Sequence, residues 1–301
     1  QIWKKFIGDA DHHEFLHKLT EDEYGNIYVA GFKSSNGLVI KYDSDGREIW
    51  ANEIDSGSVD RAREIKLDSQ GNVYVLGRTE GSLDGNSNSG GSDVFLVKYD
   101  SHGNHIWTEQ LEAKVEGSPG KYLQDRMGLV IDEHDNIYIS GYTDGEFPGQ
   151  THSGTSDTFV ARYDTEGSLV WLRQLGTEED EVESGLVIDG DGNLNLIGRT
   201  RELWGDETQS GGHDYDVYIT KLDPDGNLGS THVLGTDRDD AVRGITSDRN
   251  GNIYVSGFTW GAFEGEKAGD TDLWVAKNPT KLSQSYNWDR TYLGENSDTE
   301  P

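Results

Sequence analysis

Apolar and polar residues alternate over short stretches of the chain, and each stretch follows a turn. In residues 248–257, Ile253 and Val255 fall on one side of an extended backbone, whereas Tyr254 and Ser256 fall on the other. A period of two is the pattern of a β-strand, and the Asp and Gly that precede it are typical turn residues. The pattern therefore predicts a turn followed by a strand. It returns four more times, over residues 22–31, 68–77, 132–141 and 189–198.

A second turn follows each of the first four copies, and in most copies it leads into a strand that carries a Trp. The turns cover residues 41–46, 98–103, 162–167 and 221–226. The Trp strands contain Trp50, Trp107 and Trp171, with Trp3 and Trp288 near the two chain ends and His232 near the same place in the fourth copy. Each repeat thus predicts four consecutive strands, named a to d below.

Repeats of this kind predict one all-β domain in which every unit needs its neighbours to bury its apolar face. We expect a five-bladed β-propeller of four-stranded antiparallel blades, closed by pairing of the N- and C-terminal strands. The predicted single domain covers residues 1–301, with units at approximately 8–55, 56–114, 115–176, 177–235 and 236–294 and with 1–7 as the closing strand. Five apolar residues of strand a are expected to pack between blades: Leu19, Ile65, Leu129, Leu186 and Ile245.

The composition of the chain disfavours some classes of binding partner. The 301 residues carry a formal net charge of −30, which disfavours nucleic acid and anionic lipid surfaces. There is no Cys, so disulfides and thiol chemistry are excluded. No apolar run reaches the length of a membrane span, and no signal peptide is recognisable, so we expect no direct membrane insertion. The 39 Gly suit many short strands and tight turns.

The chain resembles a known family, the SBBP-type β-propeller repeat, which is related to NHL repeats. The residues that carry the resemblance are 251–255, the run from 145–149 to 157–160, and the run from 98–100 to 107–110. The resemblance implies a propeller in a secreted or cell-surface bacterial protein, with the periplasm as an alternative location, and it implies no catalytic motif. The family implies seven blades, whereas five repeats are present; a five-bladed ring and a fragment of a larger protein both stay open.

The loop between strands b and c is the variable part of the repeat. It is long in four repeats, where an apolar residue lies near a Gly (Leu83, Phe147, Trp204, Phe263) and an Asp precedes strand c (Asp93, Asp157, Asp216, Asp272). Loops on a rigid scaffold commonly bind ligands, and Trp204 and Trp260 are the candidate ligand-binding residues because Trp stacks on sugar rings. The alternative is that the apolar residue fixes the loop to its blade and the Asp caps backbone amides.

Asp189, Asp191 and Asn193 are the candidate metal ligands. Their oxygen side chains alternate as in a calcium loop, although the twelfth position is Thr200 rather than Glu. A plain Asp-Gly turn is the alternative. Residues 13–17 fit the HExxH pattern of zinc peptidases, but that chemistry needs a helix, and we expect strand a here.

Acidic residues also recur near the start of strand a, at Asp11, Asp60, Asp125, Asp180 and Asp240. A ring of these acids at one mouth of a propeller could hold a cation, or each acid could hydrogen-bond its own neighbouring loop; we expect the latter.

The sequence leaves three candidate functions. The leading one is a non-enzymatic binding or surface-interaction module, with a protein or glycan ligand on one propeller face and Ca²⁺ as its only candidate cofactor. The others are a propeller glycosidase or lyase with acids at the central channel, and a structural subunit of a larger complex.

Overall fold

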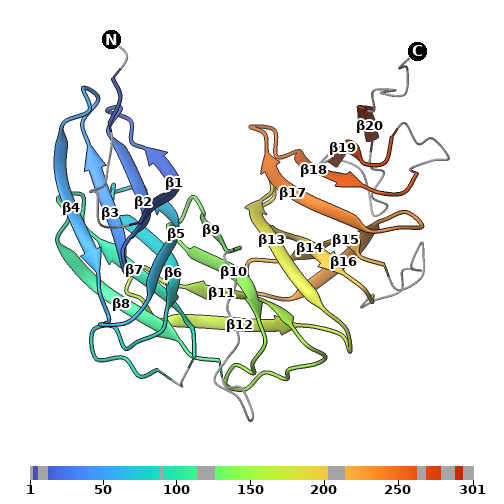
Figure 1. The fold of residues 1–301 in the computed structure, drawn as a ribbon, viewed down its shortest axis with the longest axis horizontal. Coiled ribbons are helices and arrows are strands. Elements are labelled where there is room, and N and C mark those ends of the chain that lie inside the picture. Colours follow the sequence, from blue (N-terminus) through green and yellow to red (C-terminus); the bar gives the residue numbers. More distant parts are fainter. Residues whose placement is uncertain are drawn as a thin grey trace. The chain divides into compact units, whose positions relative to one another are not determined.

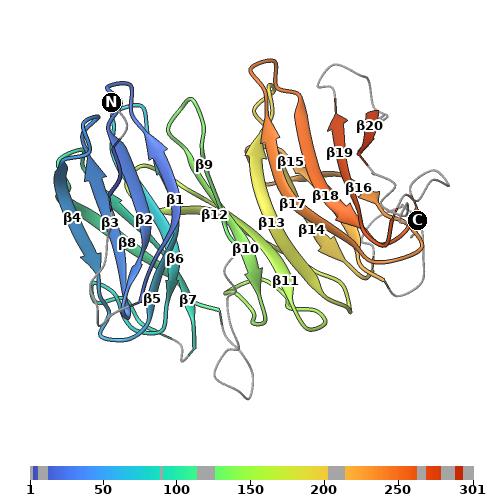
Figure 2. The same cartoon turned by 45° about the horizontal axis from the view of Figure 1, so that its top comes forward.

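The computed structural model describes residues 3–5, 13–88, 91–113, 126–202, 214–262, 269–278 and 289–293. Its regular elements are β-strands arranged as five sheets of four, and the strands of each sheet lie side by side in chain order (Figures 1 and 2). The predicted all-β class and the four-stranded repeat are therefore confirmed. The contacts divide the chain into two compact units, which are described separately below.

The sheets have the following strands. The first contains β1 (Glu14–Glu21), β2 (Ile27–Lys33), β3 (Asn36–Tyr42) and β4 (Glu48–Ile54). The second contains β5 (Asp60–Leu67), β6 (Val73–Thr79), β7 (Asp93–Tyr99) and β8 (His105–Leu111). The third contains β9 (Gly128–Ile131), β10 (Ile137–Thr143), β11 (Asp157–Tyr163) and β12 (Leu169–Leu175). The fourth contains β13 (Glu181–Ile188), β14 (Leu194–Thr200), β15 (Asp216–Leu222) and β16 (Leu228–Leu234), and the fifth β17 (Asp240–Ser247), β18 (Ile253–Thr259), β19 (Asp272–Asn278) and β20 (Asp289–Leu293).

One Asp holds the turn between strands a and b in every sheet. In the fifth sheet, Oδ1 of Asp248 accepts hydrogen bonds from the amides of Asn250 (2.8 Å) and Asn252 (3.0 Å). Its Oδ2 accepts from Nδ2 of Asn252 (2.7 Å) and from the hydroxyl of Tyr254 (3.1 Å). The turn also needs a left-handed residue three positions after the Asp, which explains the recurring Gly. In the third sheet Asp135 takes this place with φ of 60°.

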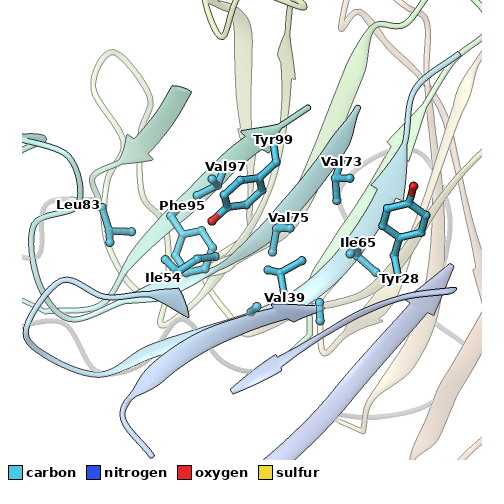
Figure 3. Packing of buried hydrophobic residues seen from close by; sticks show 12 residues of the cluster. Tyr28, Val39, Ile54, Ile65, Val73, Val75, Leu83, Phe95, Val97 and Tyr99 are labelled. Atoms are coloured by element: carbon cyan, nitrogen blue, oxygen red, sulfur yellow. The ribbon is translucent and has the colours of Figure 1, made fainter. Parts of the chain in front are cut away.

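Apolar side chains of the first and second sheets form one buried core, and those of the fourth and fifth sheets form another. The face of the first sheet with Tyr28, Ala30 and Val39 packs against the face of the second with Ile65 and Phe95 (Figure 3). The face that touches the following sheet is called the back face, and the face that touches the preceding sheet the front face. The fourth and fifth sheets repeat this junction, with Ile197 and Ile219 against Val242, Val255 and Trp274.

The expectation for strand a is confirmed in four sheets and wrong in one. Ile65, Leu129 and Leu186 are buried, and Ile245 packs against a buried cluster. Leu19, by contrast, is 65% exposed. The physical reason is that the first sheet has no sheet before it in the order of the chain.

A Trp of strand d latches each of the first three sheets to the next sheet's c–d turn. Nε1 of Trp107 donates to the carbonyl of Thr165 at 3.2 Å, and Nζ of Lys98 donates to the same oxygen at 2.8 Å. Trp50 and Lys41 share the carbonyl of Ser101 in the same way, and Trp171 donates to that of Pro224. In the fourth sheet the third residue of strand d is Ser230, so His232 does not take the position of the Trp.

The two ends of the chain make different contacts with the sheets. Strand β20 pairs with β19 and completes the fifth sheet, which answers which segment supplies its fourth strand. Trp3, the third residue of the predicted closing strand, donates through Nε1 to the carbonyl of Ser44 at 3.1 Å. It thus occupies the latch position of the first sheet. Closure of the sheets into a ring remains a prediction, because residues 1, 2 and 6–12 lie outside the described part.

Candidate functional site

The edge from which the b–c loops project carries a row of buried polar residues. Strands a and c start at this edge and strand b ends there, so their terminal residues are neighbours. In the second sheet Asp60 is paired with Thr79, which is paired with Asp93. The fourth and fifth sheets repeat this acid, Thr, acid row as Glu181, Thr200, Asp216 and as Asp240, Thr259, Asp272. All nine residues are at most 3% exposed.

The first acid of each row holds the loop that leads into strand a. Asp60 accepts from the amide of Ser56 at 2.8 Å and from its hydroxyl at 2.9 Å. Glu181 accepts from the amide and the hydroxyl of Thr177 at 2.7 and 2.6 Å. Asp240 is bound in the same way by Thr236. The expectation that these acids hydrogen-bond their own loops is therefore confirmed for Asp60 and Asp240.

The fourth sheet corrects one assignment. The residue in register with Asp60 is Glu181 rather than Asp180, because strand a begins one residue later than the spacing suggested. Asp180 instead accepts a hydrogen bond from the hydroxyl of Tyr215 at 3.0 Å. A Ser or Thr four residues before the acid is the sequence signal that identifies the correct position. Asp11 and Asp125 lie outside the described residues.

The acid before strand c ties the b–c loop to strand d. Nε2 of Gln110 donates to Asp93 at 2.9 Å, and Nε2 of Gln174 donates to Asp157 at 2.7 Å. Asp157 also accepts from the amide of Ser153 at 3.1 Å. These carboxylates act as braces between backbone segments, as the capping interpretation predicts.

Burial changes the ionisation of the acids in this row. Desolvation raises the pKa of Glu181 to about 7, despite the hydrogen bonds that Thr177 and Thr200 donate to its charged form. The same cause raises the pKa of Asp240 to about 6 and raises that of Asp60 and Asp157 above the ordinary range. A raised pKa accompanies catalytic acids, but structural networks produce it too. Here the groups face loop amides and hydroxyls of their own sheet.

The b–c loops are anchored by the predicted apolar residues where these are described. Leu83 is 4% exposed and Phe147 is fully buried. The amide of Leu83 donates to Oε1 of Gln110 at 3.1 Å, so side chain and backbone of this loop are both fixed. Trp204 and Phe263 lie outside the described residues. Around the anchors the loops expose polar positions, including Asp84, Glu146 and Thr151.

Trp260 follows strand b of the fifth sheet and is 38% exposed. Its ring packs edge-on against Phe258 with 4.7 Å between ring centroids, and its amide donates to the carbonyl of Asp239 at 3.1 Å. One side of the indole is therefore held and the rest is open to solvent. Its role in stacking on a ligand stays a prediction.

The three candidate metal ligands form the a–b turn of the fourth sheet. Asp189 accepts from the amides of Asp191 and Asn193, both at 3.0 Å, and its Oδ2 lies 2.8 Å from Nζ of Lys221. Although burial alone raises it, the hydrogen bonds from Lys221 and Asn193 hold the pKa of Asp189 below its ordinary value. The geometry is that of the other a–b turns. Among the described residues no three His, Asp or Glu side chains are grouped as ligands for an ion.

The HExxH segment lies on a strand, as expected. His17 is part of β1, and its Nε2 lies 2.6 Å from a guanidinium nitrogen of Arg63. His13 precedes the strand, where its carbonyl accepts from the amide of Ser34. A helix that would bring both imidazoles to one zinc is therefore not formed.

Five consecutive four-stranded antiparallel sheets, the first three of which are latched to the next sheet, form an all-β repeat architecture. Residues 228–264, from β16 to just beyond β18, match the family model described as SBBP, beta-propeller repeat. The predicted resemblance is thus confirmed, and the chain contains an SBBP repeat.

A relative and two solved structures give the wider context. Regulatory protein FlaEY of Caulobacter vibrioides is 27% identical over 257 residues, which cover 76% of this chain and 25% of that protein. The chain therefore spans about a quarter of this curated relative. The Pan2 WD40 domain of Neurospora crassa has a TM-score of 0.51 at 12% identity, covering 93% of this chain and 66% of that one. The polysaccharide lyase Uly1 has 0.50 at 9%, covering 96% and 74%. At these identities the structures share the fold alone.

Proposed function

We propose that the chain is a non-enzymatic binding module of a secreted or cell-surface bacterial protein, with the b–c loops as the contact surface for a protein or glycan. The observation that carries the proposal is the construction of these loops. Buried Leu83 and Phe147 and the buried acids fix the loop bases, while polar residues around them are exposed. A preorganised loop binds without the entropy cost of ordering it first. The secreted setting is supported by the SBBP resemblance.

A glycan array and a two-variant comparison test this function. The chain would be labelled and applied to the array, and the strongest signal would be measured again with Trp260→Ala. We expect binding to fall about tenfold, equivalent to about 1.4 kcal/mol, because Trp is enriched among the interface residues whose truncation costs more than 1 kcal/mol. Ile106→Ala is the matched control, because Ile106 is 48% exposed on the outer strand β8 and away from the loops. Equal loss in both variants would contradict a role for the loops.

Calcium is tested separately, with Asp189, Asp191 and Asn193 as its proposed ligands. Thermal unfolding would be followed with added Ca²⁺ and with chelator. An ion bound only by the folded chain raises the melting temperature, and the stabilisation grows with the logarithm of the ion concentration once this exceeds Kd. A rise that Asp191→Ala abolishes would support the site, whereas identical melting temperatures with ion and chelator would remove calcium from the proposal.

A second candidate function is a structural or assembly subunit. It is favoured by one observation: exposed Leu residues at positions where other sheets of the chain make buried junctions. Monomeric proteins seldom expose apolar patches of this kind without a partner.

A further inference from the structure

Ser156, the last residue of the third b–c loop, connects this loop to the start of the fourth sheet. Its carbonyl accepts a hydrogen bond from the amide of Glu181 at 2.9 Å, and its hydroxyl donates to the carbonyl of Glu181 at 3.2 Å. The next residue in the chain is Asp157, so two buried acids, Asp157 and Glu181, flank the connection. Residues 152–161 and 171–301 belong to the same compact unit.

The second acid distinguishes this connection from the one between the first and second sheets. There the amide of Asp60 donates to the carbonyl of Ser35 at 2.6 Å, in the same manner. The residue after Ser35 is Asn36, the first residue of β3, whereas Asp157 is the first residue of β11. The earlier connection therefore has an Asn where the connection at Ser156 has a second acid.

Asp157 is bound by nitrogen donors and by a titratable loop residue. The amide of Ser153 and Nε2 of Gln174 donate to its carboxylate at 3.1 and 2.7 Å, and neither group can accept a hydrogen bond. Nδ1 of His152 lies 3.2 Å from Oδ2 of Asp157, and the imidazole is 22% exposed whereas the carboxylate is fully buried. Burial raises the pKa of Asp157, while the hydrogen bonds from Gln174 and Ser153 and the charge of His152 oppose this rise. A proton that His152 takes up from solvent thus converts the contact into an ion pair that holds the loop to β11.

Glu181 is bound by groups that suit either of its protonation states. The hydroxyls of Thr177 and Thr200 donate to Oε1 of Glu181 at 2.6 and 2.8 Å, and a hydroxyl can equally accept the proton of a carboxylic acid. Burial raises the pKa of Glu181 to about 7, and the negative charge of Asp157 adds to the rise, against the hydrogen bonds from Thr177 and Thr200. Glu181 therefore gains or loses its charge near neutral pH while its hydrogen bonds persist.

The elements packed around His152, Asp157 and Glu181 carry further charged side chains. The cations have contacts of their own: Arg173 donates to a backbone carbonyl, and the guanidinium groups of Arg199 and Arg201 lie 4.4 and 4.3 Å from the ring centroid of Tyr215. The acids are Glu178, Glu179 and Asp180 before β13, Glu202 after β14 and Asp216 on β15. These acids add to the cost of a second negative charge beside Asp157.

We propose that His152, Asp157 and Glu181 form a proton-controlled clamp, which fixes residues 152–156 at acidic pH and releases them at alkaline pH. At acidic pH His152 carries a positive charge, Asp157 a negative charge and Glu181 none, so the charges cancel. At alkaline pH His152 is neutral and both acids are ionised, so two negative charges repel one another across Ser156. The clamp thereby regulates the b–c loop surface, and this part of the inference rests on the binding function proposed above.

Amide hydrogen exchange tests the clamp without any ligand. Exchange of residues 152–156 would be measured in the wild type at pH 5 and pH 8, with each rate divided by the intrinsic rate at that pH. We expect about tenfold lower protection at pH 8, because repulsion opens this segment locally. Residues 34–36, where Asn36 stands in place of the second acid, should change less. Equal protection of residues 152–156 at the two pH values would overturn the clamp.

Two variants assign the response to particular protons. Glu181→Gln has no charge to gain and should keep most of its protection at pH 8. His152→Gln retains an amide donor for Asp157 but takes up no proton, so its protection at pH 5 should fall toward the pH 8 value. Because His152 is partly exposed, this variant carries the test if Glu181→Gln does not fold.

Glu146→Gln is the matched control for these variants, because it removes an exposed acid from the same loop. It should respond to pH like the wild type. A wild-type response in His152→Gln, or in a folded Glu181→Gln, would overturn the assignment of the clamp to these residues.

Ligand binding tests the regulatory part separately. The strongest ligand from the glycan array would be measured at pH 5 and pH 8. We expect about threefold tighter binding to the wild type at pH 5, since a larger fraction of the chain then has the loop in its competent state. This preference should vanish in the double variant His152→Gln with Glu181→Gln, and an equal preference in both proteins would overturn the regulation. An array without any ligand would contradict the binding function alone, because the exchange experiment still supports or overturns the clamp.

Discussion

The hydroxyl of Thr200 donates to Oε1 of Glu181 at 2.8 Å, and both side chains are buried. Burial raises the pKa of Glu181 from 4.5 to about 7. Between these two values the folded chain holds a proton that the unfolded chain has lost. The free energy of unfolding contributed by this group is therefore greatest below pH 4.5 and decreases as the pH rises to about 7.

Glu181→Gln should remove this pH dependence. A shift of this size corresponds to on the order of 3 kcal/mol between the two ends of the range. Urea unfolding at pH 5 and pH 8 should show the wild type losing up to about that much more stability than the variant. Glu146→Gln is the control, because Glu146 is exposed in a b–c loop. Parallel pH profiles for wild type and Glu181→Gln would contradict the assignment.

Because the indole of the latch packs on a turn Gly, we expect any side chain at that Gly to lower the free energy of unfolding. Gly103 has φ of 85°, and a Cβ there would lie 2.7 Å from Cδ2 of Trp50. Gly103→Ala should lose stability through both backbone strain and displacement of the ring, together about 2–4 kcal/mol.

Gly85 separates the two effects. Its φ is 83°, but no atom lies within 4 Å of its would-be Cβ, so Gly85→Ala should show the strain alone, about 1 kcal/mol. Chemical unfolding of both variants measures the difference. If the two substitutions cost the same, the latch does not contribute to stability.

We expect the Asp carboxylates of the a–b turns to stay ionised at low pH. The pKa of Asp248 is lowered to about 2, first by the hydrogen bond from the Asn252 side chain and then by backbone amides. Its stabilising contribution is present above pH 3.8 and is lost as the pH falls through about 2. An NMR titration of the Asp248 carboxyl should give a midpoint near this value. Asn252→Ala should move the midpoint upward, while Asn250→Ala retains its backbone donor and should leave it in place.

The loop anchors predict that Phe147 controls the order of residues 144–156. Phe147→Ala removes a fully buried ring and should cost about 3–5 kcal/mol. Hydrogen exchange in this loop should accelerate by more than in the neighbouring strands. Pro148→Ala is the matched control, because Pro148 is exposed beside the anchor. Unchanged exchange in Phe147→Ala would show that the loop is held by other contacts.

The sequence by itself determined the strands, the turns between them and the order of the four strands within each repeat. These features depend on local chemistry: the Asp that binds amides two and four residues ahead, the left-handed Gly, and the period of two. The same local rules explain why Asp135 could replace Gly and why the buried anchors Leu83 and Phe147 were recognised beside their turns.

The tertiary structure alone decided which faces are covered. Leu19 and Ile65 have the same place in the repeat, yet one is exposed and the other buried, because burial depends on a neighbouring sheet rather than on the strand itself. The assignment of Glu181 instead of Asp180, and the double use of one carbonyl by Trp107 and Lys98, likewise follow from register and from contacts between sheets. A repeat fixes its own geometry through neighbours in sequence, whereas its junctions form between residues more than fifty positions apart in these latches.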